Sequence, residues 1–174
     1  MKIREMLSRD KITFSCEIFP PKKDSDFHEV FQVVDKINQL GVDFISVTYG
    51  AGGSTSKKTV EVASYIQKKH ANTALAHLTC IDASKEHIRA QLEALQTNKI
   101  ENIMALRGDK PKDFTKSPSY THAIDLVKDI RATGDFCIGS ACYPEGHIEC
   151  EHKQDDLAFL KAKVDAGVDF LTTQ

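Results

Sequence analysis

Charged and polar side chains stand at the ends of several short apolar runs in this sequence. The first run closes on Glu17, which Ile18 and Phe19 follow. In a strand with a two-residue period, Glu17 shares a face with Thr13 and Ser15. A carboxyl group among apolar neighbours favours its neutral form, because burial penalises the charge. Glu17 is therefore a candidate general acid, and a salt bridge at the rim is the alternative.

The third and fourth runs contain groups that could hold a ligand. His77 stands in the third run, where a hydrogen-bonded core histidine is the alternative to a binding role. The fourth run closes on Arg107-Gly108-Asp109, whose guanidinium offers forked donors for a phosphate or a carbonyl. The carboxylate of Asp109 can stabilise a cation. A structural ion pair between Arg107 and Asp109 is the alternative.

A glycine-rich segment follows the second run at residues 50–55, with the sequence Gly-Ala-Gly-Gly-Ser-Thr. Such a segment at the start of a helix lets backbone amides approach a phosphate or a flat ring. It departs from the dinucleotide-binding pattern GxGxxG, because Thr55 takes the place of the third glycine. A plain loop between a strand and a helix is the alternative.

The fifth run ends on Cys142 and Tyr143, and His147, Cys150 and His152 follow closely. Cysteine and histidine are common zinc ligands, but these spacings match none of the usual zinc patterns. We expect no metal site here.

An alternation of strands and helices would position these groups. Short β-rich runs predict strands, and a stretch with apolar residues three and four apart, the spacing of a helix, follows each of the first five. Strand followed by helix, several times over, predicts parallel pairing of the strands. The predicted strands are 12–19, 44–49, 74–81, 103–107, 136–143 and 170–173, and the predicted helices are 27–40, 57–69, 85–96, 121–132 and 154–166.

Glycine stands where three of the predicted helices end, at Gly41, Gly134 and Gly167. A helix often ends on a residue in the left-handed conformation, which glycine adopts without a steric penalty. We therefore expect the left-handed conformation at all three positions.

One internal repeat indicates the architecture. The segment 41–48, Gly-Val-Asp-Phe-Ile-Ser-Val-Thr, recurs 126 residues later as Gly-Val-Asp-Phe-Leu-Thr-Thr-Gln at 167–174. Four strand-helix units separate the copies, which gives about 31 residues per unit, as in a (βα)8 barrel. We expect an α/β fold, a (βα)8 TIM barrel that is incomplete, with six of its eight strands present. A doubly wound open sheet is the alternative.

The composition excludes several classes of protein. The chain has 174 residues, 41% of them apolar, which is enough for a buried core in one domain. Its 23 basic and 25 acidic residues leave no basic surface for nucleic acid or acidic lipid. No run resembles a membrane span or a secretory signal, and the five cysteines lack CxxC spacing, which argues against a disulfide framework. We expect a cytoplasmic protein with small-molecule substrates, and a homo-oligomer is left open.

Together the strand ends resemble the methylenetetrahydrofolate reductases, which are flavoproteins with a TIM-barrel fold. The matching segments follow the family order and cover essentially the whole chain. The resemblance implies that residues 1–174 form a single flavin-binding catalytic domain that is truncated at its C-terminus. The segments are 14–21 (FSCEIFPP), 46–51 (SVTYGA), 77–80 (HLTC), 105–109 (ALRGD), 141–147 (ACYPEGH) and 163–167 (KVDAG), leading to Thr173-Gln174.

The resemblance implies an FAD-dependent oxidoreductase of one-carbon metabolism and methionine biosynthesis. FAD would take a hydride from NAD(P)H and pass it to 5,10-methylenetetrahydrofolate, giving 5-methyltetrahydrofolate. Glu17 matches the family's general acid, Asp109 the carboxylate between flavin and pterin, and Gln174 the amide that grips the pterin. The residues that match the family's FAD contacts are Thr48, Tyr49, Ala51, His77, Arg107, Gly108, Asp109, Tyr120, Thr121, Tyr143, His147, Asp156 and Lys163.

Two alternatives to this function stay open. One is a non-catalytic, truncated barrel fragment. The other is a flavin-free barrel enzyme that binds a pterin or a phosphate and would lack the yellow colour of a flavoprotein. Some bacterial members of the family carry Asn and Arg in the fifth helix where this chain has Phe159 and Ala162.

Overall fold

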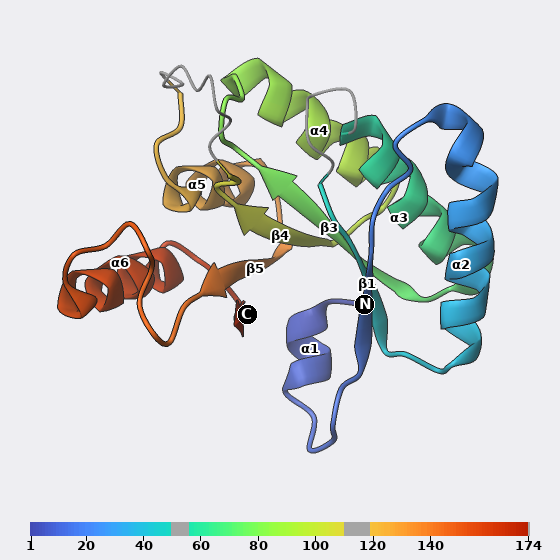
Figure 1. Ribbon diagram of the computed structural model, residues 1–174, viewed down its shortest axis with the longest axis horizontal. Coiled ribbons are helices and arrows are strands. Elements are labelled where there is room, and N and C mark those ends of the chain that lie inside the picture. Colours follow the sequence, from blue (N-terminus) through green and yellow to red (C-terminus); the bar gives the residue numbers. More distant parts are fainter. Residues whose placement is uncertain (50–55, 110–118, 174) are drawn as a thin grey trace.

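In the computed structural model, which describes residues 1–49, 56–109 and 119–173, the chain forms one curled parallel sheet (Figure 1). The strands pair in sequence order from β1 to β6. A doubly wound sheet reverses its strand order at a switch point, so this uninterrupted order excludes that alternative. The strands are β1 (Ser15–Ile18), β2 (Phe44–Val47), β3 (Thr73–Thr79), β4 (Asn102–Leu106), β5 (Cys137–Cys142) and β6 (Phe170–Thr173).

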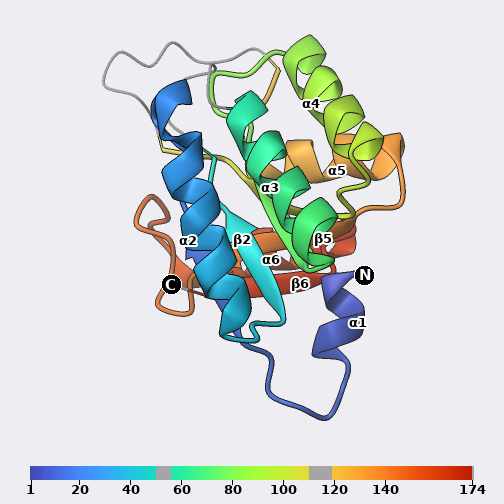
Figure 2. The ribbon, with the colours of Figure 1, turned by 90° about the vertical axis from the view of Figure 1, so that its right-hand side faces the viewer.

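Helices connect the successive strands and cover the outer face of the sheet (Figures 1 and 2). The parallel βα units make a curled half-barrel, which confirms the expected barrel architecture, and the predicted strands and helices agree with the observed ones to within a few residues. No helix in the described part of the chain is long and apolar enough to cross a membrane. The helices are α1 (Ile3–Leu7), the 3-10 helix η1 (Asp24–Asp26), α2 (Phe27–Gln39), α3 (Ser56–His70), α4 (Lys85–Thr97), α5 (Ala123–Thr133) and α6 (Lys153–Asp165).

Apolar side chains fill two layers, one on each face of the sheet. The larger core packs the outer face against the helices, and Ile45, Ile66, Ile103 and Ile130 lie fully buried in it. The smaller core lies on the inner face and includes Leu75 of β3. Because successive residues of a strand point to opposite faces, both layers can be built from the same strands. The helices therefore leave the inner face free to carry a site at one end of the strands.

The short helix α1 was not predicted, and it closes the inner core at the beginning of the strands. Ile3 and Met6 of α1 are buried against Leu75, Met104 and Cys137, which come from β3, β4 and β5. A helix of only five residues is too short to show a helical period in the sequence. Its position is decided by contacts with residues far along the chain.

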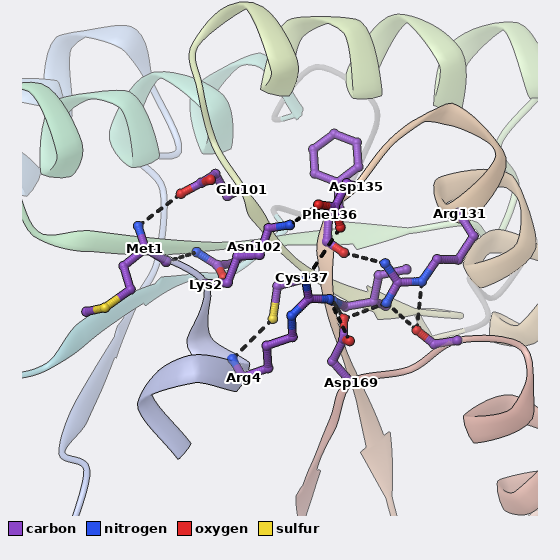
Figure 3. A network of polar contacts seen from close by, with 12 residues as sticks. Met1, Lys2, Arg4, Glu101, Asn102, Arg131, Asp135, Phe136, Cys137 and Asp169 are labelled. Atoms are coloured by element: carbon purple, nitrogen blue, oxygen red, sulfur yellow. Dashed lines mark hydrogen bonds and ion pairs between the residues drawn. The ribbon is translucent and has the colours of Figure 1, made fainter. Parts of the chain in front are cut away.

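Polar contacts hold α1 in this position (Figure 3). The amide of Ile3 donates to Oδ1 of Asn102 at 2.8 Å, and Lys2 forms an ion pair with Asp135. The guanidinium of Arg4 donates to Oδ1 of Asp169 at 3.0 Å. These bonds tie the start of the chain to the segments that begin β4, β5 and β6.

The aspartate of the internal repeat has the same structural role in both copies. The amide of Asp43 donates to the carbonyl of Phe14 at 2.8 Å, and its Oδ2 accepts from the amide of Phe14 at 3.0 Å. Asp169 makes the equivalent pair of bonds to Ile138, both at 2.8 Å. Each aspartate therefore fastens the start of its own strand to the preceding strand, which is the physical reason for the repeat.

The side chain of Asp169 makes more hydrogen bonds and ion pairs than that of Asp43, and this predicts a larger contribution of Asp169 to the stability of the fold. Burial alone would raise the pKa of Asp169, but the Ile138 amide, Arg4 and Arg131 bind the carboxylate and lower the pKa below its usual value. A carboxylate with a depressed pKa stabilises the fold at neutral pH, and this contribution is lost as the pH falls below about 4.

Asp169→Ala is therefore expected to cost about 2–3 kcal/mol of unfolding free energy at pH 7. Urea unfolding at pH 7 and at about pH 3 measures it, and the difference from the unchanged chain should shrink at the lower pH. Asp43→Ala is the matched control, with a smaller loss, because Asp43 pairs with the half-exposed Lys11. Equal losses at both pH values would contradict the role given to the Asp169 charge.

The three glycines at helix ends do not all behave as expected. Gly41 and Gly167 have φ of 72° and 116°, which confirms the left-handed conformation there. Gly134 was wrongly predicted, because its φ is 174°, which is extended backbone. A Cβ at Gly134 would lie 2.7 Å from Nε2 of Gln96, the far end of a flexible side chain that can move aside, so nothing in the described structure requires glycine at this position.

Candidate functional site

The predicted site residues follow strands that all run in the same direction. Parallel strands bring their carboxyl ends to one edge of the sheet, which is where barrel enzymes carry their sites. Glu17 of β1, Thr48 after β2, His77 of β3, Arg107 after β4 and Tyr143 after β5 all lie toward that end.

Glu17 and His77 meet on the inner face of the sheet. Oε2 of Glu17 lies 3.4 Å from Nε2 of His77. The Glu17 side chain is 54% exposed, so its expected burial among apolar neighbours was wrong. Ile18 points instead into the outer core, and Phe19 is 74% exposed, because neighbours along a strand alternate between faces.

The ring of His77 is almost enclosed, with 11% of the side chain exposed. Burial lowers the pKa of His77 to about 4, because the charged imidazolium would lose its hydration. His77 is therefore neutral at physiological pH, and its contact with Glu17 is a contact between a neutral ring and a carboxyl group. Nε2 of the same ring lies 2.7 Å from the hydroxyl of Ser46 on β2, a residue that the sequence did not single out.

Thr48 presents a buried hydroxyl group without a partner. Its Oγ1 makes no hydrogen bond within the described part of the chain, and the hydroxyl of Thr13 is in the same situation. The amide of Thr48 donates to the carbonyl of Ile18 at 3.0 Å, which fixes Thr48 beside the end of β1. A buried hydroxyl that lacks a partner costs free energy, so Thr48 is suited to bond a ligand at this edge.

Arg107 is held by an acidic residue that the sequence did not point to. Its two terminal nitrogens donate to the two oxygens of Glu149 at 2.7 and 2.9 Å, a bidentate pair. These bonds raise the pKa of Arg107 above its usual value. The structure thus gives Arg107 this partner, while the side chain of Asp109 is exposed to solvent. Gly108 between them has a φ of 89°, which favours glycine.

The loop between β5 and α6 brings three more predicted residues together. The rings of Tyr143 and His147 meet edge to face, with centroids 5.0 Å apart. Oδ2 of Asp156 accepts from the amide of His147 at 3.1 Å, and Nζ of Lys163 donates to the carbonyl of Ala141 at 2.5 Å. Burial lowers the pKa of Lys163. Asp156 and Lys163 therefore brace the loop and α6 against β5.

The comparison of the sequence with known protein families decides which family the chain belongs to. Residues 2–174 match the family described as methylenetetrahydrofolate reductase. The chain belongs to the methylenetetrahydrofolate reductase family. The resemblance of the strand ends to this family is thereby confirmed.

Similar proteins from plants and bacteria carry the same family name. The methylenetetrahydrofolate reductase (NADH) 1 of Arabidopsis thaliana is 40% identical over 188 residues, which cover 99% of this chain and 32% of that protein. The 5,10-methylenetetrahydrofolate reductase of Buchnera aphidicola is 40% identical over 168 residues, covering 95% of this chain and 56% of that protein. The chain spans about a third of the plant relatives and about half of the bacterial ones.

Solved structures that resemble the chain share its fold. A 2,3-dimethylmalate lyase superposes with a TM-score of 0.65 at 11% identity, covering 99% of this chain and 61% of that one. The phosphoenolpyruvate phosphomutase of Streptomyces platensis superposes with a TM-score of 0.67 at 12% identity, covering 98% and 62%. At such low identity the likeness speaks for the barrel architecture alone.

Three more residues of this member of the reductase family that were predicted to contact FAD make hydrogen bonds within the chain, namely Tyr120, Thr121 and Tyr49. Tyr120 is 2% exposed, and its hydroxyl donates to Oδ2 of Asp129 at 2.6 Å. The amide and the hydroxyl of Thr121 donate to Oδ2 of Asp125 at the start of α5. Both residues thus secure the beginning of α5, and their FAD contacts stay predictions. The hydroxyl of Tyr49 lies 3.1 Å from Nε2 of His87.

Two predicted residues, Ala51 and Gln174, lie outside the described residues, as does the glycine-rich segment 50–55. Among residues 1–49, 56–109 and 119–173, no group of three or more histidine, cysteine or acidic residues could hold a metal ion.

Proposed function

We propose that this chain carries the active site of an FAD-dependent enzyme that reduces 5,10-methylenetetrahydrofolate to 5-methyltetrahydrofolate. Membership of the family supports the reaction. The observation that carries the proposal is the pairing of Glu17 with His77 on the inner face, at the end of the strands where Thr48 holds a buried hydroxyl that has no hydrogen-bond partner among the described residues. As a proposal, residues 1–174 are a flavin-binding catalytic domain of a cytoplasmic enzyme in one-carbon metabolism and methionine biosynthesis.

The residues at the strand ends fit a flavin. Thr48 offers a buried hydroxyl that has no partner in the part of the chain that the structure describes and can bond a polar atom of the cofactor. Arg107 places a positive charge at this edge, where Glu149 holds its two terminal nitrogens, and Tyr143, which is 41% exposed, offers a flat apolar face. When bound, FAD supplies the hydride chemistry, which takes a hydride from NAD(P)H and delivers it to the folate. For the nicotinamide we propose NADH, because the plant relatives are named methylenetetrahydrofolate reductase (NADH) 1.

Glu17 and Asp109 are proposed as the two acidic residues that act on the folate. The carboxyl group of Glu17 would donate a proton that opens the five-membered ring of 5,10-methylenetetrahydrofolate to an iminium cation. The negative charge of Asp109 would favour that cation electrostatically. Gln174 is proposed to grip the pterin.

The hydroxyl of Thr48 gives a test of flavin binding. Thr48→Val keeps the shape of the side chain and removes its hydrogen bond, so FAD affinity should fall about 5- to 10-fold. Titration of the apo-protein with FAD, followed by the quenching of flavin fluorescence, measures the affinity.

Thr13→Val is the matched control. It removes the other buried hydroxyl that lacks a partner among the described residues, two positions before β1, and should leave FAD affinity unchanged. An equal effect of both substitutions would refute a direct contact of Thr48 with the flavin. Failure of the unchanged protein to bind FAD would favour the flavin-free barrel enzyme.

A further inference from the structure

Ser46 on β2 makes a hydrogen bond that the reaction proposed above does not explain. Its Oγ lies 2.7 Å from Nε2 of His77 on the neighbouring strand. Ser46 is buried, with 6% of the residue exposed. A short bond between a buried hydroxyl and a ring nitrogen fixes the orientation of both groups.

The hydroxyl hydrogen of Ser46 determines which nitrogen of His77 carries the proton. Within the described residues, Nε2 of His77 is the partner of this hydroxyl. If Nε2 carried a hydrogen and donated it to Ser46, the hydroxyl hydrogen would be left buried without an acceptor, which is costly. The favourable arrangement therefore has Ser46 as the donor, Nε2 as the acceptor and the single ring hydrogen on Nδ1.

This arrangement acts on Glu17, because Oε2 of Glu17 lies 3.4 Å from the same Nε2. An unprotonated Nε2 presents a lone pair, which attracts the O–H of a neutral carboxyl group and repels a carboxylate. A ring with hydrogen on Nε2 would instead donate that hydrogen to a carboxylate, and it would offer no lone pair to the O–H of a neutral carboxyl group. The choice between the two ring forms therefore decides whether Nε2 accepts a hydrogen bond from Glu17 or donates one to it.

We propose that Ser46 is a positioning residue, which holds His77 in the Nδ1–H form and thereby turns an unprotonated Nε2 toward the carboxyl group of Glu17, so that the ring can orient that group for the folate. The part of this inference that concerns the folate rests on the proposed function, whereas the expected tautomer of His77 is independent of that function.

The charges around His77 agree with this role. On the flanking strands Ser46 of β2 and Met104 of β4 lie beside His77, and neither titrates. The described titratable side chain in contact with the ring is Glu17 of β1. Arg107, beyond the end of β4 at the same end of the sheet, is paired with Glu149. Glu17 and the ring are thus a local pair.

The tautomer can be observed without any turnover. In protein labelled with ¹⁵N-histidine, the nitrogen chemical shifts tell a protonated ring nitrogen from an unprotonated one, and His77→Gln assigns the signals. We expect Nδ1–H for His77 between about pH 5.5 and 8, since a ring with the pKa given above is neutral there. Ser46→Ala should convert the ring mainly to the Nε2–H form, and Ser46→Thr, which keeps the hydroxyl, should preserve Nδ1–H.

The same variants test the effect on the positioning of Glu17. In Ser46→Ala the rate of the folate half-reaction at neutral pH should fall about tenfold, because the carboxyl group of Glu17 loses the acceptor that orients it. Reduction of the flavin by NADH should stay within about twofold, since it does not use the proton of Glu17. Ser140→Ala is the matched control, because Ser140 is a buried serine of the same sheet that donates to Ala105 at 3.0 Å.

The possible results separate the inference from the proposed function. An Nε2–H ring in the unchanged protein, or a ring form that Ser46→Ala leaves unaltered, would overturn the role of Ser46. So would an equal loss of the folate half-reaction in Ser46→Ala and Ser140→Ala. If the tautomers behave as expected but the unchanged protein does not reduce the folate, the proposed function fails and the control of the ring by Ser46 stands.

Discussion

Glu17→Gln is expected to slow the reduction of 5,10-methylenetetrahydrofolate by at least about 100-fold. Glutamine keeps the size of the side chain and its capacity for hydrogen bonds, but it has no carboxylic proton to donate. Reduction of the bound flavin by the nicotinamide should continue at nearly the normal rate, because hydride transfer to the flavin needs no general acid. Stopped-flow absorbance separates the two half-reactions.

Glu29→Gln is the matched control for this prediction. Glu29 is an exposed residue of α2 on the outer side of the sheet, and its substitution should leave both half-reactions unchanged. Equal losses in both half-reactions of Glu17→Gln would contradict the role of Glu17 as an acid. Such a result would indicate instead that the substitution disturbs the flavin site as a whole.

Asp109→Asn is expected to slow the folate half-reaction by about 10- to 100-fold. The substitution removes a negative charge with little change in size, so a cation forming on the folate loses its electrostatic support. The reduction potential of the flavin should rise, because an anion near the ring disfavours the electron-rich reduced form. Equilibration of the flavin with a redox dye under anaerobic conditions measures the potential.

Asp10→Asn removes the same charge far from the site, from an exposed residue between α1 and β1. It should change neither the potential nor the rate. If Asp109→Asn changed the reduction potential of the flavin no more than Asp10→Asn does, Asp109 would lie away from the flavin ring.

The βα units could be predicted from the sequence because local pattern decides them. The apolar spacing in residues 27–40 and 85–96 marks helices that α2 and α4 match closely. The helix α1 could not be predicted, because its five residues are held by contacts with β3, β4 and β5. Gly134 was misjudged because a glycine at a helix end does not show whether the chain leaves in the left-handed or, as here, in the extended conformation.

The repeat that contains Asp43 and Asp169 could be seen in the sequence, but the hydrogen bonds of these two aspartates could not be predicted from it. Each aspartate bonds the main chain of the preceding strand, a contact across about one βα unit that no local pattern shows. The sequence could therefore predict the spacing of the units and not the bonds that maintain it.

The candidate site also combines residues that could be predicted from the sequence with contacts that could not. The type and position of Glu17 and His77 at the ends of their strands could be predicted, whereas the contact between them depends on the curl of the sheet. Ser46 shares a strand face with Thr48, and that period was the available signal for it. Glu149 gave no such signal, because it reaches Arg107 from a loop that is 42 residues away.

The proposed reaction is tested most directly by the absorbance of the purified protein near about 450 nm, where oxidised flavin absorbs. Under anaerobic conditions, NADH should bleach this band, and subsequent addition of 5,10-methylenetetrahydrofolate should restore it as 5-methyltetrahydrofolate forms. A protein that carries this chain and shows no flavin band, or whose bleached band the folate does not restore, would contradict the assignment.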